Sequence, residues 1–155
     1  MERRPRVFLD TSVLFAAVLS PEGGARMVLK LGEAGLLTLL VGNTVLAEAD
    51  SVVAREAPET RPRLALLLDA AAVAVGPRPS RKVLRDARVW VAHAGDAAIL
   101  AEALAARAEW LLSHDKRHLL GVDASGMGLK IGTPGDLIAS LRESLIVRAV
   151  SLHRY

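Results

Sequence analysis

The sequence predicts an α/β protein, a three-layer α/β/α sandwich with a mainly parallel sheet of about five strands. Short apolar runs of strand length alternate with longer segments of helical periodicity, the order that gives parallel strands joined by helices. The runs are apolar at consecutive positions, as in strands covered on both faces. With 155 residues, 52% of them hydrophobic, the chain can bury one core, and we expect residues 1–155 to form a single domain.

Each predicted strand is a short apolar, β-branched or aromatic segment bounded by turn-forming or charged residues. In chain order the strands are 6–9, 36–41, 72–75, 109–113 and 129–131. The first is followed by Asp10 and the third by Gly76 and Pro77. Because a parallel sheet aligns the carboxyl ends of its strands, residues that directly follow the strands should share one edge.

Helices are predicted at 12–19, 25–34, 44–57, 62–70, 81–91, 96–108, in a short segment after Asp115, and from Pro134 to about Leu145 or beyond. Their ends carry recognised signals. Gly35 and Pro58 each follow a helix, and Asn43 and Ser80 are suitable N-caps. Thr133 precedes the proline that opens the last helix.

Composition and charge exclude several classes of protein. The absence of cysteine excludes disulfide frameworks, zinc–thiolate sites, iron–sulfur clusters and thiol nucleophiles. No apolar run approaches the roughly 18 residues of a membrane span. Asp10 interrupts the apolar start that could suggest a signal peptide, so we expect a cytoplasmic protein without a membrane partner. The net charge of +3 permits a nucleic-acid partner without establishing one.

Three aspartates stand where a site at the sheet edge would need them. Asp10 ends the first strand and Asp115 follows the fourth, so both belong to the same edge. On a helical wheel, Asp96 lies about 40° from Leu100 and about 20° from Ala103, so it heads a buried stripe. Asp96 and Asp115 would also suit N-caps, whereas an aspartate that closes a buried strand has no routine capping role.

A fourth acidic position is ambiguous. Glu48 and Asp50 lie at opposite margins of the apolar arc of their helix, each about 100° from its centre, so periodicity does not choose between them. If several of these carboxylates converge, each raises the pKa of the others, and a divalent cation removes that conflict. Oxygen ligands without cysteine favour Mg²⁺ or Mn²⁺ over zinc.

Four segments, in this order, resemble the motifs of PIN-domain ribonucleases. VFLDTS at 7–12 resembles their opening strand with Asp-Thr-Asn/Ser, and NTVLAE at 43–48 resembles their second acidic site. GDAAILAEA at 95–103 is similar to the third, in which an aspartate leads an alanine-rich helix. WLLSHDKRHLL at 110–120 resembles the fourth, Thr/Ser-x-Asp followed by a basic and apolar turn. The resemblance leans toward the VapC-like branch, the toxins of toxin–antitoxin modules.

The resemblance implies a PIN-like fold and a metal-dependent endoribonuclease, which cleaves RNA phosphodiesters with a water activated by Mg²⁺ or Mn²⁺. It also implies a homodimer and a possible cognate antitoxin. The residues that it assigns to the site are the catalytic metal ligands Asp10, Glu48, Asp96 and Asp115, the catalytic hydroxyl of Ser113, and the supporting residues Thr11 and Ser12. Asp10 and Asp96 would be the most direct ligands.

Basic residues near these motifs are candidates for RNA binding. The set comprises Arg81, Arg85, Arg88, Lys116 and Arg117. The three arginines share one face of their helix. This pattern is more typical of a solvated charged face, and the alternative is a groove that follows an RNA backbone.

The chain departs from the family pattern at Gly95, where many relatives carry a further acidic residue, so its cluster carries less negative charge. His114 and His118 are four residues apart, but no glutamate-containing zinc motif accompanies them. The absence of that motif favours a pH-dependent neighbour of the acidic cluster over a zinc site.

Two other functions fit the same residues. A non-catalytic PIN-like binding module would keep the fold without cleavage. A phosphatase of the haloacid-dehalogenase type also carries an aspartate at the end of its first strand. That chemistry needs a second aspartate two positions on, where this chain has Ser12.

Overall fold

The computed structural model describes residues 3–153, and across this part of the chain the strands form one five-stranded, all-parallel sheet in the order β3-β2-β1-β4-β5. The strands are β1 (Arg6–Leu9), β2 (Thr38–Val41), β3 (Ala74–Val75), β4 (Trp110–Leu112) and β5 (Lys130–Gly132). The predicted fold class is confirmed. Each strand lies within one or two residues of its predicted place. The three central strands β2, β1 and β4 are deeply buried, whereas both residues of the edge strand β3 are exposed.

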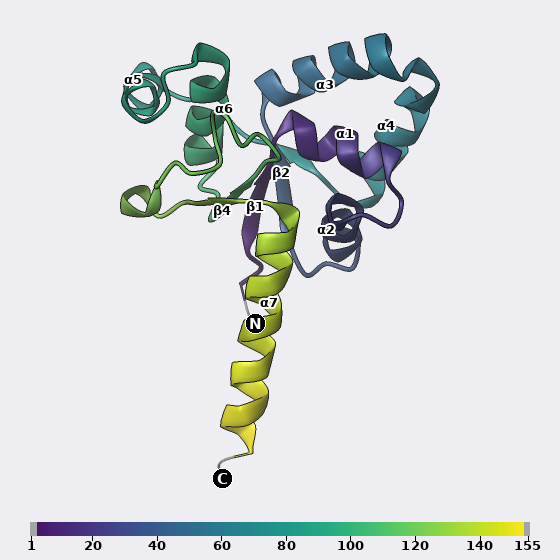
Figure 1. Ribbon diagram of the computed structural model, residues 1–155, viewed down its shortest axis with the longest axis vertical. Coiled ribbons are helices and arrows are strands. Elements are labelled where there is room, and N and C mark those ends of the chain that lie inside the picture. Colours follow the sequence, from purple (N-terminus) through teal and green to yellow (C-terminus); the bar gives the residue numbers. More distant parts are fainter. Residues whose placement is uncertain (1–2, 154–155) are drawn as a thin grey trace.

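Helices cover both faces of the sheet. They are α1 (Thr11–Leu19), α2 (Gly24–Glu33), α3 (Asn43–Glu56), α4 (Arg61–Ala70), α5 (Arg81–Trp90), α6 (Ala94–Ala105) and α7 (Pro134–Leu152), with short 3₁₀ turns at Pro58–Thr60 and Ser125–Met127. Figure 1 shows α1 to α4 on one side of the strands and α5 and α6 on the other, which gives the three layers. The first part of α7 packs against α2, β4 and β5.

Strand β1 lies at the centre of the sheet and of the core. Val7, Phe8 and Leu9 are fully buried, and β1 pairs with β2 on one side and β4 on the other. From β1 the chain moves outward to β3 and then returns to place β4 beside β1. The loops after β1 and β4 therefore leave the sheet at its topological switch point, which is where open α/β sheets form their binding sites.

Five helices begin one or two residues earlier than the sequence predicts, and the starts of α3 and α6 bear on the site. Helix α3 begins at Asn43, with Gly42 rather than Asn43 as its N-cap. The buried carboxylate of Glu102 replaces a local cap, since its Oε1 accepts bonds from the amide (3.0 Å) and the hydroxyl (2.8 Å) of Thr44. Helix α6 begins at Ala94, so Asp96 occupies its third position and is not an N-cap.

The prediction of a short helix after Asp115 is wrong, because residues 116–121 form consecutive turns. Asp115 accepts the amides of Arg117 and His118, as a cap would, but no helix follows. Ser80 does cap α5, and Thr133 opens α7 with a capping box completed by Asp136.

The outer half of α7 extends away from the rest of the molecule, as Figure 1 shows. Every residue from Arg142 to His153 is exposed, including Leu145, Ile146 and Val150. Among residues 3–153 no single helix has the length and apolarity of a membrane span. Only α1 and α2 taken together pass that test, across a 94° bend.

Candidate functional site

Asp10 is the central acidic residue of the site. Its backbone amide still belongs to the sheet, because it donates to the carbonyl of Leu112 at 3.0 Å, and the residue is only 5% exposed. The side chain is held at both oxygens. Oδ1 accepts the Thr11 amide at 2.7 Å, and Oδ2 accepts the hydroxyls of Ser113 at 2.7 Å and Ser12 at 3.0 Å. Asp10 is thus the N-cap of α1, contrary to the expectation that it has no capping role.

Two serine hydroxyls join the loop after β4 to Asp10. Ser113 is fully buried; its Oγ donates to Asp10 and accepts the amide of Asp115 at 2.9 Å. Ser12 donates to the same carboxylate and accepts the amide of His114 at 3.0 Å. The positions of Asp10 and Asp115 are therefore fixed relative to each other through hydroxyl groups.

Asp96 enters the site from α6, on the other face of the sheet. It is 9% exposed and heads the buried stripe of its helix, as the helical wheel predicts. His93 Nδ1 lies 2.8 Å from Asp96 Oδ2, and His118 Nδ1 lies 3.9 Å from the same oxygen. Burial raises the pKa of Asp96 above its ordinary value, the charge of Asp115 raises it further, and Asp10 adds to this, while His93 and His118 oppose the shift.

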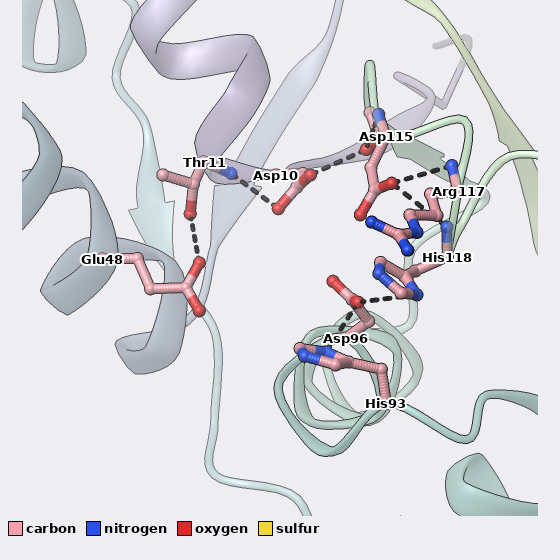
Figure 2. Close-up of polar contacts among 9 residues, drawn as sticks. Asp10, Thr11, Glu48, His93, Asp96, Asp115, Arg117 and His118 are labelled. Atoms are coloured by element: carbon pink, nitrogen blue, oxygen red, sulfur yellow. Dashed lines mark hydrogen bonds and ion pairs between the residues drawn. The ribbon is translucent and has the colours of Figure 1, made fainter.

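Asp96, Asp115 and His118 form a set of donors that fits a metal ion. Each offers one ligand atom, and these atoms all lie within 4.8 Å of one another. Asp115 uses Oδ1 to accept the amides of Arg117 (2.9 Å) and His118 (3.1 Å). Figure 2 shows the carboxylates of Asp10, Asp96 and Asp115 directed toward one shared space. Carboxylates crowded in this way favour a divalent cation as their partner.

The structure separates Glu48 from Asp50. Glu48 is half-buried, and its Oε2 accepts the hydroxyl of Thr11 at 2.8 Å, so it reaches the group through the residue next to Asp10. Asp50 is exposed on the outer face of α3 and forms an ion pair with Arg61. The hydrogen bond from Thr11 of α1 thus distinguishes Glu48 from Asp50. The periodicity of α3 alone could not predict it, because Thr11 lies on another helix.

Comparison with known proteins identifies the family. The model of the family described as "PIN domain" matches residues 6–117. This chain belongs to the PIN-domain family. No curated protein matches the sequence of this PIN domain.

Solved structures resemble this PIN domain in fold. VapBC2 from Rickettsia felis, bound to a DNA fragment from its promoter, has a TM-score of 0.56 and 18% identity over 72% of this chain and 89% of that one. VapC20 from Mycobacterium tuberculosis, described as a sarcin–ricin loop cleaving toxin, has a TM-score of 0.49 and 18% identity over 72% of this chain and 91% of that one. At 18% identity, the likeness to VapBC2 concerns the fold alone.

None of the candidate RNA-binding residues of the PIN domain belongs to the set of metal donors, but Arg117 borders it through its amide, which donates to Asp115. Arg81, Arg85 and Arg88 are exposed on α5, which packs against α6, the helix that carries Asp96. Lys116 and Arg117 are exposed in the turn directly after Asp115. Among the described residues, no ion pair joins these five side chains to an acid.

His93 is a residue of the PIN-domain site that sequence reasoning missed. It is the N-cap residue of α6, it contacts Asp96, and its ring stacks on that of His118 with centroids 4.7 Å apart. The available signal was its position three residues before Asp96, which places both on one face only if the helix starts early. Of the two histidines singled out from the sequence, His118 faces the cluster and His114 is exposed.

Proposed function

We propose that this PIN domain is an endoribonuclease that depends on Mg²⁺ or Mn²⁺, and that it is the toxin of a toxin–antitoxin pair. The observation that supports the proposal most strongly is the convergence of acids from separate segments at the switch point of the sheet. Asp10 ends β1, Asp96 heads α6, Asp115 follows β4, and Glu48 approaches from α3. Capping of backbone amides explains Asp10 and Asp115 taken alone, but it explains neither Asp96 nor Glu48, nor the convergence of the four acids.

In this proposal Asp10, Glu48, Asp96 and Asp115 hold the cation, with Asp10 and Asp96 as the most direct ligands. A bound cation supplies Lewis acidity, since it polarises phosphate oxygens and lowers the pKa of a water molecule. The protein supplies position. Ser12, Thr11 and Ser113 hold the carboxylates in place, so the site requires little rearrangement before it binds its charged partners.

The remaining partners are also proposals. We propose that exposed basic residues on α5 and in the turn after Asp115 contact the RNA backbone. Replacing Arg81, Arg85 and Arg88 by glutamate should then weaken RNA binding and reduce its dependence on salt concentration, while Arg63→Glu on α4 should not. A homodimer, a cognate antitoxin, a cytoplasmic location and a single domain over residues 1–155 complete the proposal.

RNA cleavage is the test of the proposed activity. Structured RNAs are incubated with the purified protein in Mg²⁺, Mn²⁺ or chelator, and we expect cutting only with a divalent cation. Asp10→Asn and Asp96→Asn should abolish it. Glu48→Gln should reduce it, whereas Asp50→Asn is the matched control, because Asp50 lies on the same helix and faces away from the cluster.

Cleavage at full rate in chelator, or in either aspartate variant, would contradict the proposal. Two results would favour the alternatives. Cation binding without cleavage of any RNA would indicate a binding module, and hydrolysis of small phosphate esters without RNA cleavage would indicate a phosphatase. Ser12, in the place of the second aspartate of such phosphatases, donates to Asp10 and offers no carboxylate.

A further inference from the structure

Two histidine rings, those of His93 and His118, border the acidic cluster next to Asp96. His93 and His118 stack with their rings 24° from parallel, and the Nδ1 atoms of both approach the same oxygen of Asp96. Neither ring is part of the acidic site that the proposed function describes.

The two histidines stand in different relations to Asp96. His93 Nδ1 lies 2.8 Å from Asp96 Oδ2 as the partner of an ion pair, so this ring sits directly against the carboxylate and orients it. The 3.9 Å from His118 Nδ1 is too long for a hydrogen bond. Two ligands of one ion, each at about 2.1 Å from it, stand about 3 to 4 Å apart, and the His118 separation falls in that range.

The backbone fixes His118 beside a second carboxylate. Its amide donates to Asp115 Oδ1, so Asp115 and His118 belong to one compact turn. A ligand atom of each lies within 4.8 Å of the other and of Asp96. The ring is about one-third exposed, and the stack on His93 holds its plane beside the two carboxylates.

We propose that His118 supplies an imidazole nitrogen to the cation held by Asp96 and Asp115, and that this centre therefore selects Mn²⁺ and other first-row transition ions over Mg²⁺. The inference rests on the proposed function, in which the cluster holds a divalent cation. Mg²⁺ takes oxygen ligands almost exclusively, whereas imidazole suits transition ions. A neutral imidazole also adds a ligand without adding negative charge to three carboxylates that already repel one another.

Metal binding to the purified full chain tests the inference without any assay of activity. The dissociation constants of Mn²⁺ and Mg²⁺ are measured by calorimetry for wild type, His118→Gln and His114→Gln. His114→Gln is the matched control, since His114 is exposed, four residues away and outside the donor set. We expect His118→Gln to weaken Mn²⁺ at least about tenfold, the scale on which loss of even an outer partner of a metal ligand acts. Its effect on Mg²⁺ should be roughly threefold or less, since oxygen ligands dominate Mg²⁺ binding.

A spectroscopic measurement on wild type does not depend on how a variant folds. Pulsed electron paramagnetic resonance of the bound Mn²⁺ should show the nitrogen coupling of a directly bonded imidazole. The coupling should disappear in His118→Gln and persist in His114→Gln and His93→Gln, because His93 acts on Asp96 and not on the ion.

The outcomes separate this inference from the proposed function. Bound Mn²⁺ without nitrogen coupling, or an equal loss of Mn²⁺ and Mg²⁺ affinity in His118→Gln, would overturn the role of His118 and leave the nuclease proposal standing. If the nitrogen coupling disappeared in His93→Gln and persisted in His118→Gln, the ligand would be His93, and the role proposed for His118 would be wrong. Nitrogen coupling without RNA cleavage would support the metal site and contradict the nuclease. Failure to bind either cation would overturn both.

Discussion

Asp96 is a buried carboxylate that faces Asp115 and Asp10, and its charge therefore opposes folding when no cation is present. Burial, then Asp115, raise its pKa, so the folded chain binds this proton more tightly than the unfolded chain does. Stability from this group is greatest at low pH. It is lost as the pH rises from the ordinary value of 3.8 through the raised pKa of the folded protein.

Replacing Asp96 by asparagine removes this opposing charge. We expect Asp96→Asn to raise the Tm of the metal-free protein at pH 7 by at least about 2 °C, and the difference from wild type to shrink as the pH falls toward 4. With Mn²⁺ added, wild type should gain stability at pH 7 and the variant should not, because the cation needs the ionised ligand. Thermal melts in chelator and in Mn²⁺, at several pH values, measure both effects.

Asp50→Asn serves as the reference, because Asp50 is exposed and paired at the surface. A metal-free Asp96→Asn protein that melts below wild type at pH 7 would contradict this account. In that case the ion pair between Asp96 and His93 would stabilise the folded protein by more than the repulsion among the carboxylates destabilises it.

The sequence predicts the elements better than it predicts their ends. The strands follow from local apolar runs, and the orientation of Asp96 follows from the period of its helix, since Leu100 and Ala103 are fully buried on the same stripe. The start of α3 could not be predicted, because its cap is Glu102, 58 residues away from Thr44. The roles of His93 and Glu48 could not be predicted either, because they also depend on contacts with residues far away in the sequence. His93 stacks on His118, and Glu48 accepts a hydrogen bond from Thr11.

The long-range cap of α3 makes a glycine necessary at Gly42. A Cβ at that position would stand 2.0 Å from Glu102 Oε2, an oxygen that is buried and has no hydrogen-bond partner in the described structure. We expect Gly42→Ala to destabilise the protein by about 1–3 kcal/mol, the cost of overpacking a filled site. It should also disorder the first turn of α3, the helix that carries Glu48. Urea unfolding and amide hydrogen exchange over Asn43–Glu56 measure the two effects.

Gly126→Ala is the matched control for Gly42→Ala. In the described part of the chain no heavy atom lies within 4 Å of a Cβ built at Gly126, so this variant should unfold at the same urea concentration as wild type. Equal stability of the Gly42 variant and wild type would mean that Glu102 does not hold the start of α3.

At the scale of the whole molecule, the outer half of α7 is attached to the fold without being packed into it. All its side chains from Arg142 onward are exposed, and its apolar residues bury little surface against the body. We expect a chain that ends after Ser144 to keep its Tm within about 2 °C of wild type, because little apolar area is lost. It should also keep the stabilisation by Mn²⁺, since the donor set lies elsewhere.

Melting curves combined with sedimentation of both chains test this expectation. A large fall in the Tm of the shortened chain would contradict it. If the proposed homodimer disappeared at the same time, the outer half of α7 would be part of the contact between copies.

The placement of β4 beside β1 determines when the acids can meet. Asp10, Glu48 and Asp96 are all synthesised before residue 110, but Asp115 and Ser113 join Asp10 only after β4 has paired with the central strand. A polypeptide still emerging from the ribosome therefore carries Asp10, Glu48 and Asp96 before the acidic cluster is assembled. The proposed catalytic centre is therefore complete only after β4 has been inserted beside β1.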